Sequence, residues 1–145
     1  LPAKNTAGIF FVNAHGRGLA TWARGRGVEE TRRVLQHEGF HQFAYRHIGT
    51  ALPVWVNEGL AQYFEDGILV NGELILGLAD AQRIQVVREA IESGREVDFD
   101  ELLSMGPDRW KATVTAGRAK STLLYAQSWA VVYFLRPSAS RRPLR

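Results

Sequence analysis

Residues 37–41 read His37-Glu38-Gly39-Phe40-His41, and this H-E-x-x-H stretch governs how the rest of the chain is interpreted. In an α-helix, positions four apart lie about 40° apart around the axis. His37 and His41 therefore project from one face and can bind a single metal ion. Glu38 is turned about 100° from His37, so its carboxylate lies beside the metal, where it can accept a proton from water. These are the groups that metal-assisted hydrolysis uses.

A surface helix can carry the same five residues by chance, so the pattern around them matters. Residues 28–47 have a helical pattern, in which Val34, His37, His41 and either Ala44 or Tyr45 form one stripe at three- and four-residue spacing. Imidazoles on an otherwise buried stripe need polar partners. A metal ion would supply them, which favours the functional interpretation.

Catalytic zinc usually takes three protein ligands and leaves a fourth position for water. One candidate for the third ligand is Glu58, in the first turn of a second predicted helix. Gly49 and Pro53 break the chain between the two helices, so the second helix can fold back and direct Glu58 at the metal. A glutamate in the first turn of a helix is also commonly a solvated residue.

The other candidate is His47, six residues after His41, a spacing that resembles the metzincin pattern. Metzincins place glycine where this chain has Ala44, because the helix must break there for the third histidine to reach the metal. On an unbroken helix His47 lies far around the axis, so we favour Glu58. Met105 is a candidate for the methionine turn of metzincins, although a lone methionine is usually a core residue.

The H-E-x-x-H stretch followed by W-x-N-E-G-x-A at 55–61 resembles the motifs of the gluzincin clan of zinc metallopeptidases. Within that clan the motif is most similar to those of the aminopeptidase N-like group and of related bacterial peptidase-like domains. The resemblance covers residues 34–66. It implies a zincin-like fold, one Zn²⁺ ion held by His37, His41 and Glu58, and Glu38 as general base. The spacing between His41 and Glu58 is shorter than in aminopeptidase N-like enzymes, and their Gly-x-Met-Glu-Asn segment is missing. The resemblance therefore implies hydrolysis of internal peptide bonds.

Other residues of the proposed site follow from this resemblance. Related enzymes stabilise the oxyanion with a downstream tyrosine or histidine, and Tyr125 is the candidate here; a core tyrosine is the alternative. A substrate strand would add to the edge formed by residues 19–23. Gln62 is a candidate partner for a histidine ring, whereas we expect Glu65 and Asp66 to lie on the surface.

Composition limits the class of protein. The chain has 145 residues, of which 46% are apolar and 23% charged, as is usual for one globular domain. It lacks cysteine, which excludes disulfides and thiolate metal sites. No apolar run is long enough to cross a bilayer, and residues 1–4 read as the start of a fragment. An exported, periplasmic or cell-surface location is favoured over the cytoplasm.

The net charge is +3, and the basic excess is concentrated at the end of the chain. Four arginines lie among prolines and serines in the last ten residues, so we expect a zincin-like domain at 1–136 and a flexible basic tail or linker at 137–145. No aromatic residues accompany this charge, and we expect a peptide or protein substrate, not a nucleic acid. The oligomeric state is not predicted.

The predicted fold class is α+β, with a small antiparallel sheet, the metal-site helix and a helical C-terminal part. Asn71-Gly72 is a strong hairpin signal. The predicted elements are strands at 8–13 and 19–23, a helix at 28–47, a helix at 55–65, a hairpin at 68–76, a helix at 80–93, a short helix from Asp98 or Asp100 to 103, an irregular segment at 105–120 and a helix at 121–135. The alternative to a peptidase is a non-catalytic zinc-binding accessory domain of a larger, exported protein.

Overall fold

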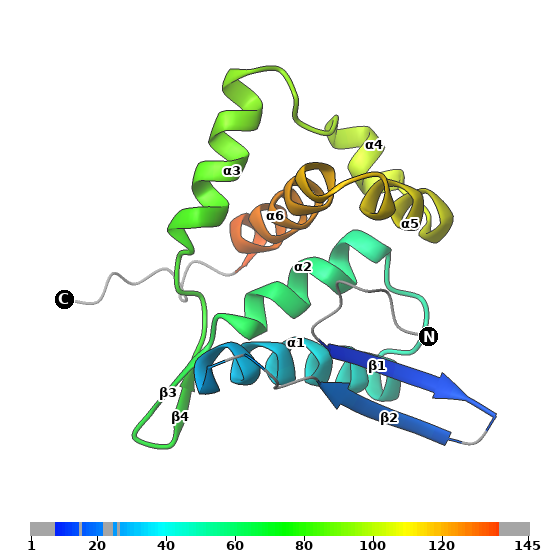
Figure 1. Cartoon of the computed structure of the whole chain (residues 1–145), viewed down its shortest axis with the longest axis vertical. Coiled ribbons are helices and arrows are strands. Elements are labelled where there is room, and N and C mark those ends of the chain that lie inside the picture. The colour runs from blue at the N-terminus through cyan, green and yellow to red at the C-terminus, as the bar shows by residue number, and fades with distance from the viewer. Residues whose placement is uncertain (1–7, 15, 22–24, 26, 137–145) are drawn as a thin grey trace.

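The computed structural model describes residues 8–14, 16–21, 25 and 27–136 (Figure 1). This part of the chain has an α+β architecture, as predicted, with six helices and two separate two-stranded antiparallel sheets. The elements are β1 (Gly8–Asn13), β2 (Gly16–Thr21), α1 (Val28–His47), α2 (Val54–Glu65), β3 (Ile68–Val70), β4 (Glu73–Ile75), α3 (Ala81–Glu92), α4 (Phe99–Ser104), α5 (Pro107–Thr115) and α6 (Arg118–Leu135).

Helices α1 and α2 form a pair whose arrangement follows from the break between them. Helix α1 ends at His47, and Gly49, two residues later, has φ +88° and donates its N–H to the carbonyl of Ala44 at 2.9 Å. This left-handed conformation is easily reached by glycine. The chain then reverses, and α2 begins directly after Pro53. Phe40, Ala44 and Ala61 pack together between the two helices.

Helix α6 packs closely against α2 at a glycine. A Cβ atom added to Gly59 would lie 2.5 Å from the carbonyl oxygen of Ser128 and 2.8 Å from a methyl of Val132. Only glycine therefore permits this approach without movement of the backbone. The contact fixes how α2 is positioned against α6, and with it the position of Glu58, the residue before Gly59.

The C-terminal helices form a second apolar cluster, where one prediction was wrong. Residues 105–120, expected to be irregular, contain α5, and α6 begins at Arg118 instead of residue 121. Helix α5 begins at Pro107, a favoured position for proline. Met105, Leu102 and Trp110 pack with Leu124, so Met105 is a core residue here and does not lie at the metal-site helix.

The two hairpins lie on either side of the α1–α2 pair (Figure 1). The second has positive φ at both Asn71 and Gly72, the type I′ geometry that this dipeptide predicts. The loop of the first hairpin is shorter than expected, because Asn13 pairs with Gly16 and β2 begins at Gly16 instead of residue 19. Residues 22 and 23 of the predicted second strand lie outside the described part. Strand β1 lies against α1, since a Cβ at Gly8 would be 2.5 Å from a methyl of Val34.

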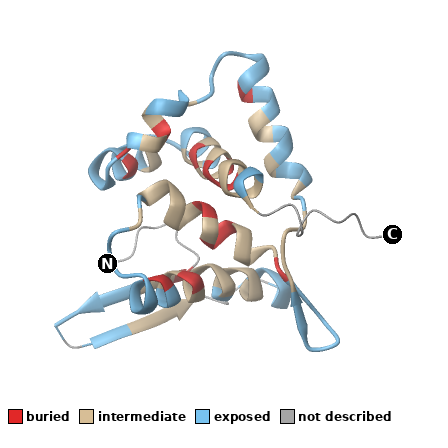
Figure 2. Cartoon of the chain, turned by 180° about the vertical axis from the view of Figure 1, so that it is seen from behind, coloured by how far each residue is buried: buried red, intermediate tan, exposed pale blue. Residues whose placement is uncertain are grey.

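Most buried positions lie on the helices (Figure 2). No helix in the described part of the chain has the length and apolar character needed to cross a membrane. The predicted basic tail at 137–145 lies outside the described residues.

Candidate metal centre

Three predicted ligands converge between α1 and α2. His37 and His41 lie one turn apart on α1, with ring centroids 4.8 Å apart. Oε2 of Glu58, from the first turns of α2, lies 3.5 Å from Nε2 of His37 and 3.6 Å from Nε2 of His41. The ligand atoms of all three residues lie within 4.8 Å of one another, close enough to hold one metal ion.

The separations fit a shared cation. An N–H···O hydrogen bond is usually about 2.7–3.2 Å long, so Glu58 is slightly too far from both imidazoles for a good direct bond. Ligands bound tetrahedrally to zinc at about 2.0–2.1 Å would lie roughly 3.3 Å apart. The observed 3.5 and 3.6 Å are close to this value. Two imidazoles and a carboxylate suit zinc and also other divalent metals.

The alternative ligand His47 is elsewhere. It is exposed in the last turn of α1, and its ring lies 4.7 Å from that of Phe43. Helix α1 continues through Ala44 without a break, because Ile48 and Gly49 both donate to the Ala44 carbonyl. His47 therefore stays on a different face from His37 and His41, as the absence of glycine at position 44 predicted.

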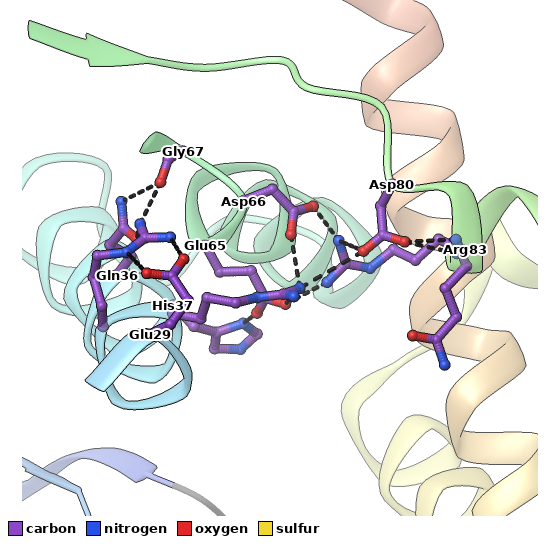
Figure 3. Close-up of polar contacts among 11 residues, drawn as sticks. Glu29, Gln36, His37, Glu65, Asp66, Gly67, Asp80 and Arg83 are labelled. Atoms are coloured by element: carbon purple, nitrogen blue, oxygen red, sulfur yellow. Dashed lines mark hydrogen bonds and ion pairs between the residues drawn. The ribbon is translucent and has the colours of Figure 1, made fainter. Parts of the chain in front are cut away.

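The residue that supports His37 was missed by sequence reasoning. Nδ1 of His37 lies 2.6 Å from Oε2 of Glu65, which comes from the last turn of α2 (Figure 3). Glu65 was expected on the surface and is largely buried instead, while Gln62 is buried but bonds neither histidine ring nitrogen in the described part. Glu65 follows Glu58 by seven residues, two helical turns on the same face. That spacing was the sequence signal that could have placed Glu65 beside the metal ligands.

Two arginines surround the other oxygen of Glu65. Nη2 of Arg33 lies 3.2 Å from Oε1 of Glu65, and Nη2 of Arg83, from α3, also bonds Oε1. The same guanidinium groups pair with Asp66 and approach Asp80 (Figure 3). Asp66 is thus a partly buried ion-pair partner and not the surface residue that was expected. These pairs tie α3 to α1 and α2.

The charges shift two pKa values in opposite directions. Burial opposes protonation of His37, but the adjacent carboxylates of Glu58 and Glu65 outweigh it and raise its pKa to about 10. Burial of Glu58 favours its neutral form, but the two nearby imidazoles of His37 and His41 outweigh this effect and lower its pKa to about 2. The site therefore holds a positive charge strongly even before a metal is considered.

His41 lacks such support. Its Nδ1 is buried and has no hydrogen-bond partner among the described residues. This nitrogen must carry the proton when Nε2 binds a metal, and a buried donor left unpaired costs about 1–3 kcal/mol. The Nε2 atoms of both imidazoles thus face the carboxylate of Glu58, but only His37 has a hydrogen-bond partner at Nδ1 among the described residues.

Glu38 is directed towards strand β1. Its Oε2 accepts a hydrogen bond of 2.7 Å from the backbone N–H of Phe10. Because neighbouring residues of a strand direct their N–H groups alternately, Phe10 presents this edge of β1 to α1 and not to β2. The strand that borders the site is therefore β1, whereas residues 19–23 were predicted to form the edge.

A pocket of about 320 Å³ opens beside two of the ligands. His41 and Glu58 form part of its wall, and the rest is mainly apolar or neutral. The other lining residues are Phe10, Ala44, Tyr45, Gly49, Thr50, Leu52 and Asn57. A ligand can therefore approach the centre from the side of His41, away from the charged cluster around Glu65.

Tyr125 is half-buried on α6, with its ring perpendicular to that of Trp110 at 5.4 Å. Burial, and then the negative charge of Glu58, raises the pKa of its hydroxyl. Tyr125 lines a separate pocket together with Gln62, Glu65 and Arg83 and is not among the residues that line the pocket beside His41 and Glu58. Its hydroxyl stays protonated at neutral pH and can donate a hydrogen bond.

Comparison with known proteins gives one match. Residues 33–142 match the family described as protein of unknown function DUF1570. No curated protein and no solved structure matches the chain. The matched region contains all three converging ligands, Glu38 and Tyr125, and it covers most of the sequence. The chain therefore belongs to the DUF1570 family.

Proposed function

We propose that this protein is a zinc-dependent peptidase of the gluzincin type, which hydrolyses internal peptide bonds with Glu38 as general base. The observation that carries the proposal is the convergence of His37, His41 and Glu58, from two separate helices, at the spacing of ligands around one ion. The motif resemblance supplies the reaction class. An exported or cell-surface location remains part of the same proposal.

The charges around the centre support a divalent cation. Four carboxylates lie in this region; the guanidinium groups of Arg33 and Arg83 pair with three of them, and the fourth faces the imidazoles. The carboxylates belong to Glu58, Glu65, Asp66 and Asp80. With both imidazoles neutral, as metal binding requires, the carboxylates exceed the guanidinium groups by two charges. A bound Zn²⁺ would neutralise this excess, and it would supply a Lewis acid that polarises a carbonyl and acidifies water towards a pKa of ~7.

Glu38 would handle the proton. It follows His37 directly, so its carboxylate lies beside the ligand face of α1 without joining it. The N–H of Phe10 holds one oxygen at 2.7 Å, and among the described residues the other oxygen has no such bond. In the proposed reaction Glu38 accepts a proton from the attacking water and passes it to the leaving amine.

Tyr125 and strand β1 have proposed roles in binding. The protonated hydroxyl of Tyr125 would donate a hydrogen bond to the negative charge that develops on the carbonyl oxygen. The edge of β1 that carries the Phe10 N–H borders the pocket, because Phe10 lines it together with His41. A substrate in extended conformation would lie along this edge and fill the pocket with a side chain.

The substitution Glu38→Gln tests the chemistry. It keeps the shape of the side chain and removes its basicity, so we expect one zinc ion per chain and a loss of peptide hydrolysis of about 10²- to 10⁴-fold, the contribution of general-base catalysis. Zinc content is measured by atomic emission and hydrolysis with a library of internally quenched peptides. Glu92→Gln, at an exposed position of α3, is the matched control and should be fully active.

The outcomes separate the two functional classes. Hydrolysis retained in Glu38→Gln would remove Glu38 from the mechanism. Zinc bound by the wild-type protein, with no cleavage of any peptide, would favour the non-catalytic accessory domain. Absence of bound zinc at saturating concentration would exclude both.

A further inference from the structure

We propose that Arg83 of α3 is a positioning residue for the metal centre, because it holds Glu65 in the orientation that fixes the ring of His37. The inference rests on the proposed metal site and adds to it a residue from a third helix. Neither the H-E-x-x-H motif nor residues 55–61 contains Arg83, and it does not touch the ligand atoms themselves.

The first step is the contact between Glu65 and His37. Oε2 of Glu65 lies 2.6 Å from Nδ1 of His37, a short and charge-assisted bond. When Nδ1–H donates to this carboxylate, Nε2 carries the lone pair and points towards Glu58, 3.5 Å away. A histidine that binds a metal generally depends on such a partner to fix its tautomer and ring orientation.

The second step is the position of Glu65. Its Oε1 is bonded by Arg83, whose side chain is only 13% exposed, and by Arg33 at 3.2 Å, whose side chain is 39% exposed. Two oxygens of one carboxylate thus bind different partners, the guanidinium groups on one side and the imidazole on the other. The more buried arginine restrains Glu65 more strongly, because it is less free to move and less screened by water.

The third step is the anchoring of Arg83 itself. Asp80 caps α3, with Oδ1 accepting from the N–H groups of residues 82 and 83, and its Oδ2 lies 3.3 Å from Nη1 of Arg83. Asp66 bonds the same Nη1, and the guanidinium lies 5.6 Å from the ring centre of Trp129 on α6. Arg83 is therefore fixed by α2, α3 and α6 together. Figure 3 shows its contacts with Asp66 and Asp80. A shift of α3 would move Glu65, and with it His37.

The experiment measures zinc affinity in four variants of the whole chain. Glu65→Ala removes both charge and acceptor, Glu65→Gln keeps an acceptor for Nδ1–H, and Arg83→Met removes the guanidinium while keeping an apolar stem beside Trp129. Arg88→Met, at an exposed position of the same helix, is the control. Dissociation constants are obtained by competition with a chelator at about pH 9, because protons compete with metal for imidazole at lower pH.

We expect the zinc dissociation constant to rise by about 10- to 100-fold in Glu65→Ala and by about 10-fold in Arg83→Met. Glu65→Gln should recover part of the loss, and Arg88→Met should equal the wild type. A second readout is the Nδ1–H signal of His37 in ¹H–¹⁵N spectra of the zinc-loaded protein. This signal should be kept in Glu65→Gln and lost or broadened in Glu65→Ala and Arg83→Met, whereas a merely structural role of Arg83 would leave it unchanged.

The result that would overturn the inference is a folded Arg83→Met protein with wild-type zinc affinity and an unchanged Nδ1–H signal. If Arg83→Met does not fold, equal affinities of Glu65→Ala and wild type overturn it instead. A wild-type protein that binds no zinc removes the proposed function and the inference together. Normal zinc binding in all variants removes the inference alone.

Discussion

The two imidazoles of the metal centre differ in what lies behind them. Nδ1 of His37 is bonded to Glu65, which two arginines hold in turn. Nδ1 of His41 is buried without a partner among the described residues, and its ring borders the pocket that opens beside Glu58. One side of the centre is therefore built from ion pairs and the other from apolar and neutral groups around a space.

This difference indicates which side is fixed and which can admit a ligand. Paired charges with several partners hold a geometry, because each group is restrained by more than one neighbour. A pocket with mainly apolar walls restrains the neighbouring side chains less and leaves room for an incoming molecule. A site that binds a metal and also acts on a substrate needs both properties, and here they are divided between His37 and His41.

The largest expected effect comes from removing either imidazole. His37→Ala and His41→Ala should each reduce bound zinc from about one ion per chain to almost none, because two ligands do not retain a metal that needs three. His47→Ala, an exposed histidine of the same helix, is the control. Zinc is measured after dialysis against a weak chelator. Loss of zinc in His47→Ala would contradict the ligand set.

The metal-site helices were predictable from the sequence because their signals are local. Helix α1 has the bounds that its pattern predicts, and α2 begins one residue before the prediction. The ligand stripe is set by helical spacing alone, and the choice of Glu58 over His47 follows from the dihedral angles that glycine allows and Ala44 does not favour.

The missed features depend on contacts between distant segments. Helix α5 lacks a strong pattern of its own and is stabilised by packing of Trp110 against the cluster that includes Leu124. Glu65 was assigned to the surface because charged residues at the end of a helix are usually solvated. Its burial depends on Arg83, 18 residues further along the chain, and single-sequence patterns do not show which helices meet.

The second effect is a dependence of zinc affinity on pH that comes from the His37 side. The pKa of His37 is raised to about 10, so below this pH zinc must displace a proton from it. The dissociation constant should fall about tenfold for each unit of pH increase between roughly 7 and 9. Chelator competition at three pH values measures the slope. The slope should be shallower in Glu65→Gln, and an affinity independent of pH would show that His37 is already neutral.

The smallest effect concerns the metal-free protein, and it sharpens the contrast between the two histidines. Because the pKa of His37 is higher in the folded state than its ordinary value of 6.5, its protonation favours folding. This contribution is complete below about pH 6.5 and is lost as the pH rises through about 10. The free energy of unfolding of wild type should therefore decrease steadily as the pH rises from about 6.5 to about 10.

Urea denaturation in the presence of a chelator measures this decrease, with His41→Ala beside His37→Ala. The decrease should disappear in His37→Ala, because the proton that is lost belongs to the imidazole between Glu58 and Glu65. It should persist in His41→Ala, since that ring has no carboxylate behind its Nδ1. Equal behaviour of the two variants would mean that Glu58 alone sets the titration and that Glu65 adds nothing to the fixed side of the centre.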